Sequence, residues 1–83
     1  MGKGRPDFIA AGIAQRRKIG RAMEDLKPGD YVPKAVVLAI DLGVSEAQAT
    51  RHRQRYIREA GWRVEYEPGG RLIVRERPVS LGA

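Results

Sequence analysis

The segment that most constrains the fold of this chain is residues 45–61, SEAQATRHRQRYIREAG, because it carries a signal for each end of a helix. Ser45 is a residue type that caps a helix N-terminus by accepting a hydrogen bond from a backbone N–H, and Gln48 can reach back to the N–H of Ser45. Gly61 suits the left-handed position that follows a last helical turn. The arginines between these signals are Arg51, Arg53, Arg55 and Arg58. The sequence therefore predicts one basic, amphipathic helix over about residues 46–60.

Beyond this helix the apolar residues change from helical spacing to alternation, which is typical of strands. In residues 62–66, WRVEY, every second residue is apolar, and residues 71–77, RLIVRER, follow a similar pattern. The intervening Pro68-Gly69-Gly70 is a turn signal, so the two runs predict a β-hairpin. Because two strands alone are marginally stable in water, one side of the hairpin is expected to pack on the helices. The side chains assigned to that side are Trp62, Val64, Tyr66, Leu72 and Val74.

A helix is also predicted near the N-terminus. Residues 8–27 carry isoleucine, methionine and leucine at helical spacing, and they follow Asp7, a residue type that caps helices. Gly12 and Gly20 weaken this segment, so one helix with a soft middle and two shorter helices both fit the pattern. The turn signal at residues 28–30, PGD, ends the segment, and the two residues after it predict only a very short strand.

Residues 33–41, PKAVVLAID, are apolar almost all round and are expected to be buried. Periodicity does not separate a buried helix from a buried strand in so short a run. We predict a helix, because Pro33 suits a first helical turn and because the tight link at residues 42–45, LGVS, leads directly into the capped helix.

A chain of 83 residues is expected to form one domain with a small core. We assign residues 7–77 to this domain, residues 1–6 to a flexible basic arm and residues 78–83 to a flexible tail. The absence of cysteine removes disulfides, thiolate metal sites and cysteine nucleophiles. No apolar run approaches the ~20 residues of a membrane span. A cytoplasmic protein with no membrane partner is therefore expected.

The net charge of the chain indicates which class of binding partner to expect. The formal net charge is +6 and the isoelectric point lies near 10.3, a balance that favours a polyanionic partner through counterion release from phosphates. The excess of Lys and Arg lies in residues 1–29 and 45–61. The chain has one histidine and shows neither a nucleophile–base pair nor metal-ligand spacing, so we expect no enzyme activity, no cofactor and no metal.

Taken in order, these elements resemble a winged helix-turn-helix domain over about residues 19–77. The resemblance is carried by Ala39, the LGVS turn, the basic helix that ends at Gly61 and the strand-turn-strand around residues 68–70. The segment LGVSEAQATRHRQRYIREAGW is similar to the second half of many bacterial and phage winged-helix regulators. The resemblance implies an α+β fold with a three-helix core followed by a C-terminal two-stranded hairpin wing. It also implies a sequence-specific binder of double-stranded DNA, either a small transcriptional regulator or a DNA-architecture factor.

In such domains the helix after the turn enters the major groove, which assigns roles to its outward residues. Gln48 and Arg51 are predicted to meet base edges, because Gln can pair with adenine and Arg with guanine. Arg55 and Arg58 lie further along the helix and are predicted to hold phosphates, and Arg71 beside the glycine turn is a further candidate. The residues predicted to contact DNA are Ser45, Ala47, Gln48, Thr50, Arg51, Gln54, Arg55, Arg58 and Arg71.

The opposite side of the same helix is expected to face the core. At about 100° per residue, the inward residues are Ala49, Tyr56 and Ala60, with His52 and Ile57 at the edge. Arg53 also projects inward, where an apolar side chain is expected. We predict either that its stem crosses the core and its guanidinium reaches water, or that it pairs with Asp41 or Glu24.

Two other functions stay open at this point. Glu65 and Glu67 on the hairpin would repel phosphate, which favours a module whose basic face binds an acidic protein partner. An RNA-binding protein is the third alternative, but the sequence places Tyr56, Trp62 and Tyr66 in the core and leaves no platform for stacking bases. A symmetric DNA site would require a homodimer, and the helix near the N-terminus is the surface predicted for it.

Overall fold

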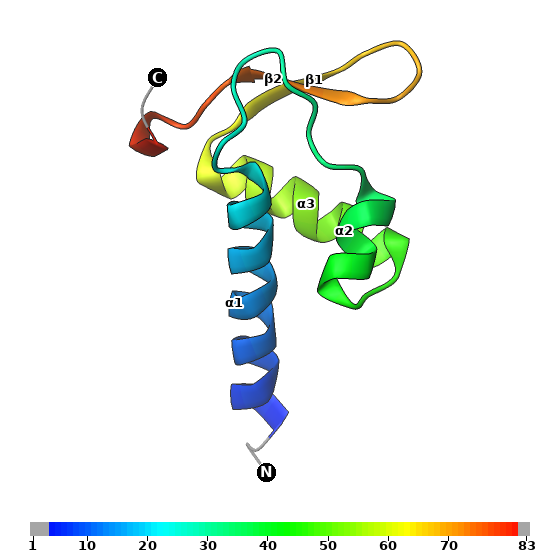
Figure 1. Cartoon of the computed structure of the whole chain (residues 1–83). Coiled ribbons are helices and arrows are strands. Elements are labelled where there is room, and N and C mark those ends of the chain that lie inside the picture. Colours follow the sequence, from blue (N-terminus) through cyan, green and yellow to red (C-terminus); the bar gives the residue numbers. More distant parts are fainter. Residues whose placement is uncertain (1–3, 82–83) are drawn as a thin grey trace.

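The computed structural model of the chain describes residues 4–81, with side chains from residue 12 onward (Figure 1). Residues 1–3 and 82–83, the ends of the predicted arm and tail, lie outside the described residues. The elements are α1 (Gly4–Met23), α2 (Ala35–Leu42), α3 (Glu46–Ala60), β1 (Arg63–Tyr66), β2 (Leu72–Glu76) and a 3-10 turn, η1 (Val79–Leu81). Three helices and a two-stranded antiparallel hairpin confirm the predicted α+β class at this level.

α1 is a single helix that is placed further toward the N-terminus than predicted. It begins at Gly4, so residues 4–6 of the predicted arm belong to the helix. Pro6 is compatible with this start, because a proline in the first turn has no N–H to leave unpaired. Gly20, one of the two glycines expected to weaken this helix, lies close to α3. A Cβ added at Gly20 would lie 3.3 Å from the Tyr56 hydroxyl on α3.

β2 lies between two partners rather than one. On one side it pairs with β1, and Tyr66 stands opposite Leu72. On the other side residues 29–32 run beside it, because the Val74 N–H donates to the Asp30 carbonyl at 2.8 Å and the Val32 N–H to the Leu72 carbonyl at 2.9 Å. The very short strand predicted after the PGD turn is therefore present as a bridge between Tyr31 and Ile73.

The core lies where α1, α2 and α3 meet one side of this small sheet (Figure 1). Its buried members are Ile19, Met23, Val32, Leu38, Ala39, Leu42, Ala49, Ile57, Trp62, Leu72 and Val74. Tyr66 was predicted among them and is 63% exposed. Tyr66 lies on β1, which has only β2 beside it, whereas its buried partner Leu72 lies on β2, which also has residues 29–32 alongside.

α2 is buried on one side only, although its sequence predicts burial almost all round. Leu38, Ala39 and Leu42 face the core, whereas the apolar side chains on the opposite side, Val36, Val37 and Ile40, are exposed. An eight-residue helix at the edge of the domain meets α3 and α1 on its inner side. The outer side has no cover among the described residues.

Arg77, the last residue before the predicted tail, is bonded to the segment after α1, and the tail itself begins with a buried residue. Pro78 is buried, and the Arg77 guanidinium donates to the carbonyls of Glu24 at 3.0 Å and Leu26 at 2.6 Å. The same guanidinium lies 5.8 Å from the centre of the Trp62 ring. Arg77 therefore joins the end of β2 to the segment after α1.

Within the described residues, no helix is both long and apolar enough to cross a membrane.

Candidate nucleic-acid interface

The ends of α3 are built as its sequence predicts. The Ser45 hydroxyl accepts from the Gln48 N–H at 3.2 Å, and the Gln48 side-chain oxygen accepts from the Ser45 N–H at 3.3 Å. At the other end Gly61 has φ 91° and its N–H donates to the Ile57 carbonyl. These local contacts start the helix at Glu46 and end it at Ala60, which confirms the predicted bounds.

The two sides of α3 also follow the prediction. Ala49 and Ile57 are buried, and Tyr56, Ala60 and His52 are half-buried. The exposed residues of the outward side are Ala47, Gln48, Arg51, Gln54, Arg55 and Arg58, and Ser45 is exposed just before them. One helix face therefore brings together most of the residues predicted to contact DNA.

Thr50 and Arg71 lie apart from the centre of this face. Thr50 is half-buried, and its hydroxyl donates to the Glu46 carbonyl at 3.0 Å. Together with Arg71 it lines a depression between α3, the start of α2 and the hairpin loop. Both residues thus border the α3 face on the hairpin side.

The capping contacts of Gln48 restrict what its side chain can read. Pairing with adenine uses both the amide oxygen and the amide nitrogen of Gln. In this structure the oxygen already accepts from the Ser45 N–H. Arg51 carries no such contact, since no hydrogen bond or ion pair joins it to another described residue. The donors of Arg51 are consequently unoccupied by any described residue, whereas the Gln48 oxygen is occupied.

Arg53 is excluded from the interface. Its side chain is buried, with 9% of the residue exposed, and one guanidinium nitrogen donates to the Pro33 carbonyl at 2.9 Å. The predicted pairing with Asp41 or Glu24 does not form, and Arg53 lines the depression between α3, the start of α2 and the hairpin loop. Desolvation by burial lowers the pKa of Arg53 below its usual value. Arg53 thus ties α3 to the residue that leads into α2.

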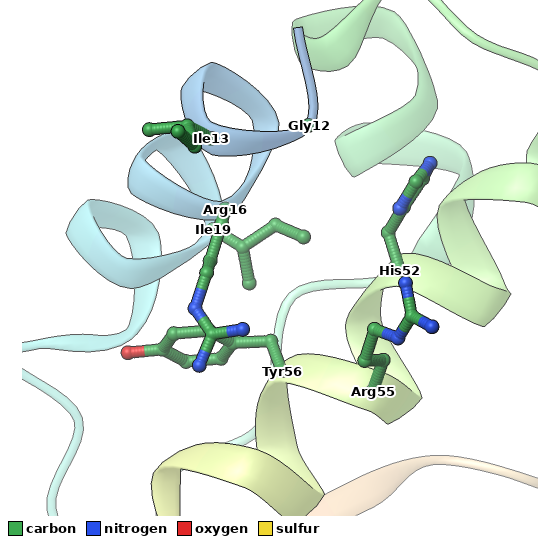
Figure 2. Close-up of a pocket in the computed structure, with 7 residues that line it drawn as sticks. All are labelled: Gly12, Ile13, Arg16, Ile19, His52, Arg55 and Tyr56. Carbon is green, nitrogen blue, oxygen red and sulfur yellow. The ribbon is translucent and has the colours of Figure 1, made fainter. Parts of the chain in front are cut away.

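A groove between α1 and α3 runs beside the exposed arginines, and it was not anticipated from the sequence. Its lining comprises Gly12, Gln15, Val44, Gln48, Arg51, His52, Gln54, Arg55 and Arg58. Figure 2 shows the adjoining pocket, where Arg16 from α1 extends over the Tyr56 ring while His52 and Arg55 project from α3. Gly12 and Gln15, near the middle of α1, form one wall of the groove, and α1 continues past α3 toward its N-terminus (Figure 1).

Glu59 joins α3 to α1 beside the adjoining pocket. It forms an ion pair with Arg16 of α1, and its other oxygen lies 3.9 Å from Arg55 one turn earlier on α3. The Arg16 guanidinium is also 5.9 Å from the centre of the Tyr56 ring. Glu59 therefore neutralises part of the positive charge beside the outward face. The spacing of Arg55 and Glu59 is visible in the sequence, whereas the contact with Arg16 depends on how α1 packs.

Two acidic side chains of the hairpin, Glu65 and Glu67, each form a hydrogen bond or ion pair with another side chain. Glu65 accepts from Arg75 at 2.5 Å. Glu67 accepts from the Tyr31 hydroxyl at 2.7 Å, and this hydrogen bond raises the pKa of Tyr31. The Arg71 guanidinium lies 4.0 Å from the centre of the same Tyr31 ring. Arg71 is thereby held at the loop end of the hairpin by a cation–π contact.

A comparison of the chain with protein-family models, with curated proteins and with solved structures finds no match in any of the three. The assignment of this surface therefore depends on its residues and their geometry alone.

Proposed function

We propose that the protein is a sequence-specific, double-stranded DNA-binding protein of the winged-helix type, and that it acts as a small transcriptional regulator or DNA-architecture factor. The observation that carries this proposal is the outward face of α3, on which Arg51, Arg55 and Arg58 are all exposed. The neutral side chains between them, Gln48 and Gln54, are polar and exposed as well. Such a face suits a major groove, where arginine is the commonest reader of guanine and further cations meet phosphates.

Each part of the surface has a role in this proposal. Arg51, in the second turn of α3, reads a base edge, while Arg55 and Arg58 neutralise phosphates further along the helix. Arg71 on the hairpin loop contacts the backbone on the other side of α3. Glu65 and Glu67 are the residues that favoured an acidic protein partner as the alternative function. In the structure Glu65 accepts a hydrogen bond from Arg75, and Glu67 accepts one from Tyr31. They give that alternative less support than the sequence suggested.

A salt titration tests the proposal directly. With three phosphate-neutralising arginines, the logarithm of the affinity for mixed-sequence duplex DNA is expected to fall with the logarithm of salt at a slope of about −2.7. Fluorescence anisotropy of a labelled duplex at several salt concentrations measures this slope. Absence of binding at low salt would refute the proposal, and stronger competition by single-stranded RNA than by duplex DNA would favour the RNA alternative.

Replacing Glu59 by Gln is expected to tighten DNA binding by about two- to fivefold at low salt, since an exposed ion pair is worth at most about 1 kcal/mol. The substitution releases Arg16 and Arg55 from their shared carboxylate while preserving the side-chain shape. Glu24→Gln makes the same change of charge at an exposed site near the far end of α1 and serves as the matched control. Equal gains in both variants would show that net charge, and not the Glu59 contact, limits binding.

A further inference from the structure

The outer side of α2 is an apolar surface on the described part of the chain that the proposed DNA contacts leave unused. Val36, Val37 and Ile40 are 48%, 56% and 81% exposed. They lie on one side of α2 because their spacings of three and four residues bring them together on a helix. Three adjacent aliphatic side chains in water are a typical mark of an interaction surface.

The charges at the edge of this apolar surface indicate what covers it. Lys34 precedes α2 and Asp41 lies in its last turn, seven residues later. Lys34 is the N-cap residue of α2, and seven residues are close to two full helical turns, so the Cα atoms of Lys34 and Asp41 lie along one edge of the surface, about 10.5 Å apart along the helix axis. Both are exposed, and neither side chain has an ion-pair partner among the described residues.

We infer that the outer side of α2 pairs with the same surface of a second copy of this chain in an antiparallel arrangement. A two-fold axis near Val37, midway between the two charges, brings Lys34 of each copy opposite Asp41 of the other. The same axis stacks the aliphatic side chains of the two helices on one another. An isologous contact of this kind is self-complementary in both shape and charge.

The homodimer surface predicted from the sequence was the N-terminal helix, of which the structure describes the side chains only from residue 12 onward. Among the described side chains of α1, Ile13 is the one large hydrophobic residue that is exposed. α2 presents three such residues together. Because α2 meets α3 with its buried side, the pairing leaves the arginine face of α3 uncovered.

The pairing is expected to be weak. Three aliphatic side chains and two ion pairs bury less than the ~800 Å² per partner of a standard interface, so the dissociation constant is expected to be on the order of 0.1 mM. Sedimentation equilibrium of the protein alone, at concentrations spanning that value, measures it without DNA. The outcome is therefore independent of whether the protein binds DNA.

Variants at exposed positions test the arrangement. Ile40→Arg is expected to raise the dissociation constant at least about tenfold, because it buries an unpaired charge in the contact. Val79→Arg, at a residue 97% exposed outside α2, is the matched control and is expected to leave the constant unchanged. Circular dichroism checks that both variants keep the fold.

A charge exchange tests the antiparallel geometry itself. Lys34→Glu and Asp41→Lys are each expected to weaken pairing severalfold, and the double variant is expected to restore it, because each ion pair then forms with its charges reversed. An equimolar mixture of the two single variants is expected to form heterodimers. The inference is overturned if the natural chain stays monomeric well above the expected constant, or if the double variant pairs as weakly as the single ones.

Discussion

Replacing Arg51 and Arg58 together by Glu is expected to lower the affinity for a selected duplex by at least about 100-fold at moderate salt. A base-reading arginine is worth about 1 to 3 kcal/mol, and the introduced carboxylates add repulsion from phosphates. The loss of the Arg58 phosphate contact is also expected to reduce the salt slope by about 0.9. Anisotropy titrations with a duplex recovered by selection from a random pool measure both quantities.

The control for this variant carries the same change of charge on another surface. Arg17 and Arg21 are exposed on α1, and neither is bonded to another described residue. On a helix they project to the side opposite Ile19, which is buried. Arg17→Glu with Arg21→Glu is expected to weaken binding only through the lower net charge, by less than about tenfold. Equal losses in the two double variants would contradict the assignment of the α3 face.

Replacing Trp62 by Ala is expected to lower the free energy of unfolding by about 3 to 5 kcal/mol, a large part of the stability of a small domain. Trp62 is 4% exposed and lies where α3 passes into β1. Its removal leaves a cavity in the core and takes away the ring beneath the Arg77 guanidinium. Urea unfolding followed by far-ultraviolet circular dichroism measures the change.

Trp62→Phe separates the volume of the ring from its polar group. The indole nitrogen is buried and has no hydrogen-bond partner among the described residues. Its loss therefore breaks no hydrogen bond described here, and the phenylalanine variant is expected to lose only about 1 to 2 kcal/mol. If Trp62→Ala cost no more than Trp62→Phe, the core around this residue would be less tightly packed than described.

The features predicted correctly are those stabilised over a few residues. The capping contacts between Ser45 and Gln48 and the left-handed Gly61 define both ends of α3 through residues of the same segment. Alternating residues and a Pro-Gly-Gly turn likewise define the hairpin. Because each signal acts through neighbouring backbone groups, the residues themselves carry the information, and the outward face of α3 follows from its helical period.

Contacts between distant segments required the folded structure. The helical period predicts that Arg53 points inward, but it does not predict the hydrogen-bond partner of Arg53. That partner is the carbonyl of Pro33, which only the packing of α2 brings within reach. The pairing of Glu59 with Arg16 depends in the same way on where α1 lies. Exposure of Ile40 and Tyr66 depends on where the domain ends, because an apolar residue is buried only if another element covers it. The local sequence pattern determines on which side of its helix or strand a side chain lies. The packing of the whole chain determines which residues contact that side.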